Sequence, residues 1–198
     1  EFLKTDLTLS SFRESGFIQY NKDIGNFTIN AGTRASYWSF NKEFLLSPRL
    51  NLAIIPLWEK DIVFRAATGI YYQSPFYREL RNLEGELNPD IESQKSTHFV
   101  LGSDYLFYSW GRPFKLISEV YYKDLQNLIP YKVDNVRIQY LAENNSNGYA
   151  TGVDLKINGE FVTGVESWAS LSVMQTMEDI EDDFYIEEET GETIYPGF

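Results

Sequence analysis

Cysteine is absent from this chain of 198 residues, and histidine occurs only once. Without cysteine, neither a disulfide framework nor a thiolate metal site can form. His98 falls at the start of a predicted strand, on its polar side, and we interpret it as a structural residue rather than a catalytic group or ligand. No Ser/His/Asp set, metal-ligand spacing or phosphate-binding glycine motif is present. We therefore predict no catalytic residue, metal site or cofactor.

Long apolar runs and an excess of positive charge are also lacking. A membrane-spanning helix is excluded because no run of about 18 apolar residues occurs, whereas a spanning strand needs only about 9 to 11 residues. The formal net charge of −12 argues against a nucleic-acid surface, which would carry clustered Lys and Arg. Residues 1–9 lack the basic leader and apolar core of a signal peptide, so we expect processing or truncation to have removed what came first.

What the chain does contain is a repeated alternation of apolar and polar side chains. This period of two is the geometry of a strand, in which successive side chains point to opposite faces. Aromatic residues are abundant at 16%, which suits strands and membrane interfaces. In residues 114–123 one face would carry Phe114, Leu116, Val120 and Tyr122, and the other Lys115, Glu119 and Lys123.

Eight strands of this kind are predicted, with a weaker ninth candidate over residues 2–10. Turn-forming or charged residues link some of them at 23–26, 57–61, 109–113 and 159–164, and longer polar links fall between these turns at 41–45, 75–94, 125–146 and 178–198. Short and long links thus alternate, as in an up-and-down membrane barrel with short periplasmic turns and long extracellular loops. The predicted strands cover about 16–22, 27–40, 46–56, 62–74, 95–108, 114–124, 147–159 and 165–177.

Four segments resemble strands and loops of TonB-dependent outer-membrane receptors of the Bacteroidetes type. The segments are Ser47-Pro48-Arg49-Leu50, residues 64–75, residues 88–96 and residues 148–155. Their order and spacing are more specific than any one of them, although Gln94 stands where the family often has Pro. The resemblance implies an all-β, antiparallel transmembrane barrel of about 22 strands filled by a plug. Residues 1–198 would then form an arc of that barrel, without plug or terminal strands.

The same resemblance carries expectations about function and partners. It implies a cell outer-membrane protein that is no enzyme and that actively imports a scarce solute such as a siderophore, glycan or peptide. The wall would contact outer-membrane lipid, and TonB would act through the plug that this chain lacks. A surface lipoprotein is a further expected partner, and nucleic acid is not.

Two groups of residues are candidates for function. Phe76, Tyr77, Arg78 and Arg81 lie in a predicted long loop, where aromatic rings beside guanidinium groups could bind a ligand; packing within the loop is the alternative. A second group is expected to line the lumen or contact the plug. It comprises Arg65, Lys115, Glu119, Lys123, Asp154 and Lys156.

Several alternatives remain open from the residues alone. Mid-strand glycines such as Gly69, Gly102 and Gly152 indicate either bulges or a plug packed close to the wall. The acidic run 178–192 is interpreted as a solvated loop, with an oxygen-ligand cation site as the sharper alternative. For the whole chain, the rivals are a self-contained eight-stranded outer-membrane barrel with a structural or adhesion role, a soluble carbohydrate-binding β-sandwich, and a barrel-borne lipase.

Overall fold

The computed structural model describes residues 10–187 and 192–195, and its main feature is one antiparallel sheet of eight strands. Neighbours in the chain are neighbours in the sheet, in the order β1-β2-β3-β4-β5-β6-β9-β10. All eight predicted strands and the all-β class are confirmed, whereas the candidate strand over 2–10 lies outside the described residues except for its last position. The strands are β1 Arg13–Ile24, β2 Phe27–Trp38, β3 Glu43–Ile54, β4 Asp61–Gln73, β5 Gln94–Ser109, β6 Arg112–Leu128, β9 Ser146–Val162 and β10 Val165–Ile180.

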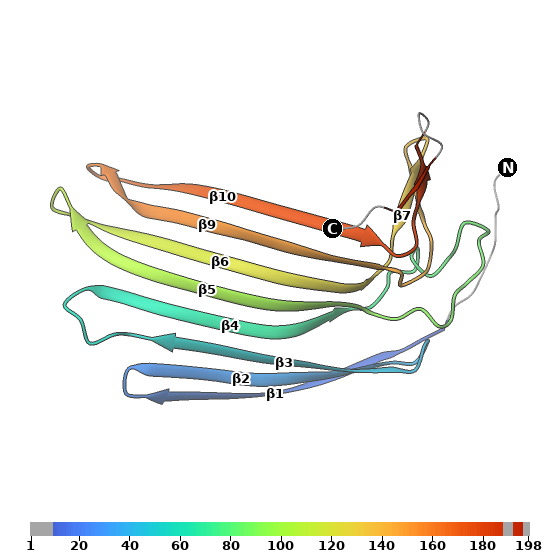
Figure 1. Cartoon of the computed structure of the whole chain (residues 1–198). Coiled ribbons are helices and arrows are strands. Elements are labelled where there is room, and N and C mark those ends of the chain that lie inside the picture. The colour runs from blue at the N-terminus through green and yellow to red at the C-terminus, as the bar shows by residue number, and fades with distance from the viewer. Residues whose placement is uncertain (1–9, 188–191, 196–198) are drawn as a thin grey trace.

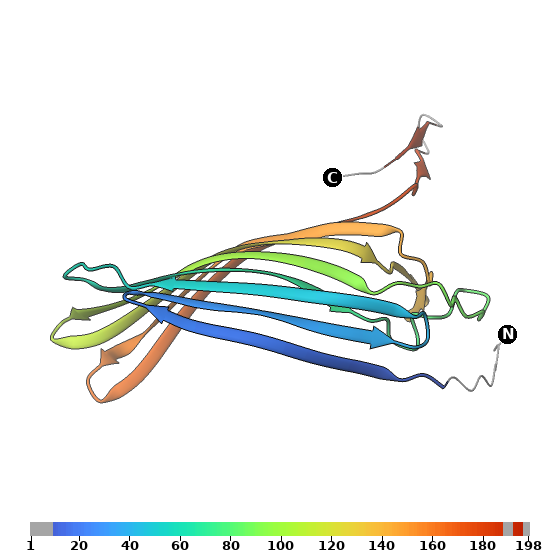
Figure 2. The same ribbon diagram turned by 90° about the horizontal axis from the view of Figure 1, so that it is seen from below.

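The sheet is a single curved layer whose two ends differ (Figures 1 and 2). Tight turns join the strands at one end. At the other end lie longer links, which contain the hairpins β7 Tyr131–Asp134 with β8 Arg137–Tyr140 and β11 Tyr185–Ile186 with β12 Thr193–Ile194. Among the described residues β1 and β10 do not pair with each other, so the sheet is open rather than a closed eight-stranded barrel. No helix in the described part is long and apolar enough to cross a membrane.

One face of the sheet is apolar and uncovered. The register aligns Leu101, Val120, Val153 and Val173 across β5, β6, β9 and β10, and residues directly opposed in antiparallel strands share a face. These four side chains are 60%, 46%, 43% and 63% exposed. A β-sandwich would bury such a row beneath a second layer. The described residues supply no such layer, which argues against the sandwich interpretation.

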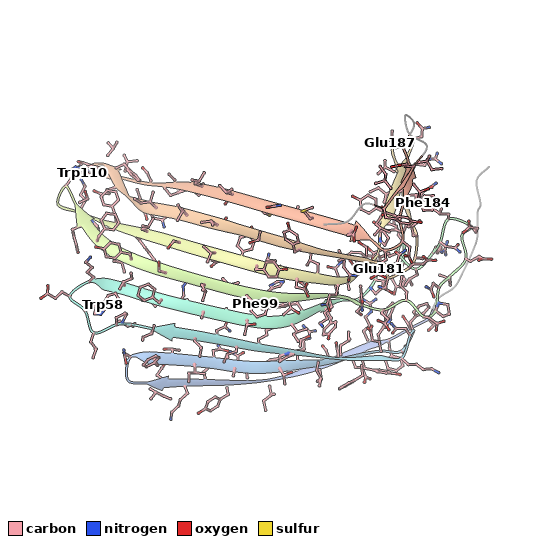
Figure 3. The ribbon with its side chains drawn as sticks, viewed as in Figure 1. Trp58, Phe99, Trp110, Glu181, Phe184 and Glu187 are labelled. Carbon is pink, nitrogen blue, oxygen red and sulfur yellow. The ribbon has the colours of Figure 1, made fainter. Side chains whose placement is uncertain are left out.

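Aromatic side chains gather toward both ends of this apolar face. Near the tight turns, the ring of Phe114 contacts Phe107 and Phe161, and Trp58 and Trp110 lie at the same end (Figure 3). Near the loops, Tyr122 stacks on Tyr149. Phe114 and Tyr122 are separated by about 26 Å along β6 at about 3.3 Å per residue, or about 20 Å along the membrane normal for a strand tilted by about 40°. That span is close to the apolar band of outer-membrane barrels.

Two of the mid-strand glycines, Gly102 and Gly152, lie close to side chains of the wall itself and are not at bulges. Contact with a plug stays a prediction. The register runs without a shift through Gly102 and Gly152. A Cβ atom at Gly152 would lie 2.6 Å from the Tyr121 hydroxyl oxygen and 2.8 Å from the Val173 carbonyl oxygen. At Gly102 it would approach the guanidinium of Arg65 at 3.5 Å. These glycines make room for side chains from neighbouring strands.

The links differ from the predicted strict alternation at one place. The link between β2 and β3 spans only residues 39–42, whereas the turn between β3 and β4 at the opposite end spans residues 55–60. The predicted long link at 41–45 is therefore wrong. β3 begins at Glu43, three residues before its predicted start, whereas β2 ends at Trp38, two residues before its predicted end. The links over 74–93 and 129–145 are long, as predicted.

The long links are folded against one another at the loop end of the sheet. Leu80 and Ile91 from the link 74–93 are 0% and 1% exposed. They form a small hydrophobic core with Trp38, Ile129 and Ala142. Burial of these side chains away from the sheet's apolar face gives the loops a stable arrangement of their own.

The close packing at Gly152 gives a test of the wall. Gly152→Ala places a methyl group against the Tyr121 ring and the Val173 carbonyl, and we expect a loss of about 1–3 kcal/mol in unfolding free energy. Urea unfolding of the complete barrel in detergent measures this loss. Ser172→Ala is the matched control. Ser172 lies in the neighbouring strand β10 on the same face of the sheet as Gly152, and the change removes one hydroxyl without adding volume. Equal stability of the two variants would contradict the packing described.

Candidate functional site

The link between β4 and β5 forms an ordered loop through its own hydrogen bonds. The Glu79 carboxylate accepts a hydrogen bond from the Phe76 amide at 2.8 Å. The Asn82 side chain accepts from the Glu86 amide at 2.8 Å, and the Gly85 amide donates to the Asn82 carbonyl at 3.0 Å. This Asx-type turn reverses the chain at Asn82, which brings Arg81 opposite Leu87 in an isolated bridge.

Hydrogen bonds to two other segments, the start of β3 and the link 129–145, hold this loop in place. The Glu43 carboxylate at the start of β3 accepts hydrogen bonds from the Ser93 hydroxyl at 2.5 Å and the Ser93 amide at 3.1 Å. The Asn88 side chain donates to the Ala142 carbonyl at 2.8 Å. The Asn144 side chain donates to the Glu92 carbonyl at 3.0 Å and accepts from the Glu92 amide at 2.7 Å. The loop 74–93 is thus fixed against the link that carries β7 and β8.

A groove of about 680 Å³ lies on the apolar face, and one of about 630 Å³ lies between this loop and the β7–β8 hairpin. The first belongs to the surface that meets lipid in a barrel. The second, which we call the loop groove, combines charge with apolar surface. One wall carries Arg78, Arg81 and Leu83, and the other carries Arg137, Ile138 and Tyr140.

The structure divides the four predicted loop residues into two pairs. Arg78 and Arg81 line the loop groove, whereas Phe76 and Tyr77 are exposed side chains that do not line it. The hairpin wall was missed because residues 125–146 were read as one polar loop. Its signal was the short alternation of Tyr131, Val133, Ile138 and Tyr140 around a turn at 135–136, too brief to stand out beside the long strands.

All six residues predicted for the lumen lie on one face of the sheet, opposite the apolar row. Asp104 is the centre of two ion pairs, since its carboxylate lies 2.6 Å from the Arg65 guanidinium and 2.8 Å from the Lys115 ammonium. Asp104 itself was not among the predicted residues. Its position in β5 opposite Val63 of β4 and Ile117 of β6 gave no sequence signal for the pairing.

The other four members extend the charged face across β6 and β9. Glu119 and Asp154 are directly opposed in the register. Lys123 lies 5.1 Å from the Tyr121 ring centroid, and Lys156 lies 5.4 Å from that of Trp168. The ammonium groups therefore pack on aromatic rings of the same face.

His98 is part of an aromatic stack on the charged face. Its ring lies 4.4 Å from that of Tyr71, and Nε2 is 2.7 Å from the Ser96 hydroxyl. The Arg49 guanidinium also lies over the Tyr71 ring, 4.5 Å from its centroid. These contacts fit the structural role predicted for His98.

The acidic run 178–192 begins inside β10 and continues past it. Glu178 accepts a hydrogen bond from Ser146 at 2.8 Å, and Glu181 accepts one from Asn147 at 2.8 Å. Glu181 and Glu187 lie at the loop end of the sheet in Figure 3. Among the residues described, no group of three or more His, Cys, Asp or Glu could hold a metal ion.

Comparison with known families identifies the wall. A family profile described as "TonB dependent receptor-like, beta-barrel" matches residues 5–192. This chain belongs to that receptor family. Its place is the cell outer membrane, and the family and the similar solved structures are receptors and transporters rather than enzymes. Comparison with curated protein sequences gave no match.

Three solved structures show the same fold as this TonB-dependent receptor barrel. The outer membrane transporter YddB from Escherichia coli has a TM-score of 0.68 at 12% identity, covering 86% of this chain and 25% of its own. The siderophore receptor PirA from Pseudomonas aeruginosa has a TM-score of 0.66 at 16% identity, and the match covers 84% of this chain and 32% of PirA. The ferric enterobactin receptor PfeA from the same species has a TM-score of 0.64 at 18% identity, and the match covers 83% of this chain and 26% of PfeA. The chain thus spans about a quarter to a third of these receptors.

The ion pair between Arg65 and Asp104 provides a second test. We expect Arg65→Ala and Asp104→Ala to show a coupling of about 0.5–1 kcal/mol in a double-mutant cycle, because the pair is short but its arginine is partly exposed. Urea unfolding of the complete receptor in detergent gives the four free energies. Lys156→Ala combined with Asp104→Ala is the control and should be additive. Additive effects in the Arg65 cycle would contradict a direct contribution of the pair.

Proposed function

We propose that this chain is part of the barrel wall of a receptor that imports a scarce solute across the outer membrane, with energy supplied through TonB. The observation that supports it best is the single two-faced sheet. One face carries the exposed row from Leu101 to Val173, and the other carries the ion pairs of Asp104. A wall between hydrocarbon and an aqueous lumen requires this division.

The open edges of the sheet support a larger barrel. β1 and β10 each have one partner strand within the described residues. Unpaired backbone N–H and C=O groups are costly in hydrocarbon, so both edges pair with further strands in the proposed receptor. A closed eight-stranded barrel, our earlier alternative, would instead pair β1 with β10.

The two groups of candidate residues take different roles in this proposal. Arg65, Lys115, Glu119, Lys123, Asp154 and Lys156 face the lumen and contact the plug, on which TonB acts. The loop end is extracellular, as the long loops of outer-membrane barrels are, and it captures the solute. The solute is a siderophore, glycan or peptide, and a surface lipoprotein is a further partner.

Cysteine labelling tests the assignment of the two faces. The chain contains no cysteine, so single substitutions give a clean signal. We expect Lys123→Cys to react with a charged, water-soluble maleimide in outer-membrane vesicles at least about tenfold faster than Val120→Cys, because hydrocarbon excludes the reagent. Labelling of both variants after unfolding in urea is the control. Faster labelling at residue 120 would reverse the proposed faces.

Uptake measurements test the import itself. Cells that lack the complete receptor and cells that lack TonB should lose accumulation of the same radiolabelled solute, tested with a ferric chelate, an oligosaccharide and a peptide. The expected loss is nearly complete for one of these solutes, because passive entry of a scarce, bulky solute is slow. Receptor-dependent accumulation that persists without TonB would refute active import.

A further inference from the structure

We propose that the loop groove binds a small ligand that carries anionic oxygens beside an apolar or aromatic group. The inference rests on the proposed receptor function and adds to it a location and a ligand chemistry. The groove's two walls come from the loop 74–93 and from β8, so the hairpin is as much a part of the site as the loop.

The charge of the groove is opposite to that of the chain. Asp and Glu outnumber Lys and Arg by 29 to 17 in the whole chain. Yet Arg78, Arg81 and Arg137 line the groove, and no Asp or Glu is among its described lining residues. Exposed charges more than about 8 Å apart are largely screened at physiological salt, so acids in distant parts of the chain contribute little at the groove. The acids next to its lining residues in the chain are Glu79, Glu84 and Glu86.

Two of the three guanidinium groups are available to a ligand. In the part of the chain that the structure describes, no hydrogen bond or ion pair of the Arg78 or Arg81 side chain is found. Two acids close to them in the chain accept local hydrogen bonds, Glu79 from the Phe76 amide and Glu86 from the Asn82 side chain at 3.3 Å. No such bond is found for Glu84 among the described residues. Arg137 has an interaction of its own within the protein, so the proposal depends on the loop pair.

The geometry of arginine favours a particular ligand chemistry. A guanidinium group presents paired N–H donors that match two oxygens of one anionic group, and it has no acceptor for a sugar hydroxyl. Leu83 and Ile138 add exposed apolar surface to opposite walls, 45% and 58% exposed. A ligand that covers them gains from burial of apolar area. An anionic ligand with an apolar or aromatic part satisfies both requirements, whereas a neutral glycan satisfies neither.

The arrangement of the groove is fixed before a ligand arrives. The loop wall is held by the Glu43 to Ser93 and Asn88 to Ala142 hydrogen bonds, and Tyr140 on the hairpin wall packs against the core of Leu80 and Ile91. A preformed site loses less conformational entropy on binding than a mobile loop does. The arginines are therefore held by a rigid base.

Calorimetric titration of the complete receptor in detergent tests the proposal. The probes are the ferric complex of 2,3-dihydroxybenzoate, which is anionic and aromatic, and maltohexaose, which is neutral. We expect the anionic probe to bind, and Arg78→Ala/Arg81→Ala to weaken its binding at least about tenfold, because charged hydrogen bonds are lost. Lys60→Ala is the matched control, since it removes one positive charge from the turn 55–60 at the opposite end of the sheet. Its affinity should equal that of the wild type.

Three results would overturn the proposal. They are no binding of the anionic probe by the wild-type receptor, equal binding by the double variant, and tighter binding of maltohexaose than of the anionic probe. Heat-dependent mobility of each variant on gels confirms that its barrel is folded. If TonB-dependent uptake is found but the groove does not bind the anionic probe, the proposed import is supported and the proposed ligand site is refuted. If the probe binds as expected but no TonB-dependent uptake is found, the proposed ligand site is supported and the proposed import is refuted.

Discussion

The backbone hydrogen bonds of the sheet are the constraint on which the rest of this structure depends. In hydrocarbon no water is available to an unpaired N–H or C=O group, so each spanning strand must be paired along its length. Eight strands meet this demand by pairing only with their neighbours in the chain, apart from the inserted β7–β8 hairpin between β6 and β9. The same demand applies at β1 and β10, and it is the physical reason why a single layer of this kind is part of a larger closed wall.

Pairing of this kind fixes which residues share a face, and this is why so much of the wall could be predicted. Because side chains alternate strictly along a strand, the apolar set with Val120 and the charged set with Lys123 follow from counting by two. Strand ends were less accurate: β1 and β10 extend to Arg13 and Ile180, beyond the alternation. Near the ends, both faces meet water or interface, so polarity no longer distinguishes them.

The loop end and the pairings on the charged face could not be predicted in the same way. The burial of Leu80 and Ile91 depends on contacts with Trp38 and Ile129, which are distant in the chain and leave no periodic signal. Asp104 was missed because its two partners come from different strands. The sequence indicated bulges or a plug at the mid-strand glycines. At Gly152 the space is instead occupied by the ring of Tyr121 from the adjacent strand. Such contacts depend on register, which the sequence alone does not give.

This difference between wall and loops explains how little sequence the wall shares with similar structures. Identities of 12% to 18% accompany TM-scores of 0.64 to 0.68, because the wall requires polarity with a period of two and not particular side chains. Different ligands can therefore be served by walls of one shape. In the proposed receptor, specificity would come from segments outside the spanning wall, and in this chain those are the loop 74–93 and the β7–β8 hairpin that faces it. The guanidinium groups of Arg78 and Arg81 lie there, outside the strands, where a change of side chain leaves the ladder of the wall intact.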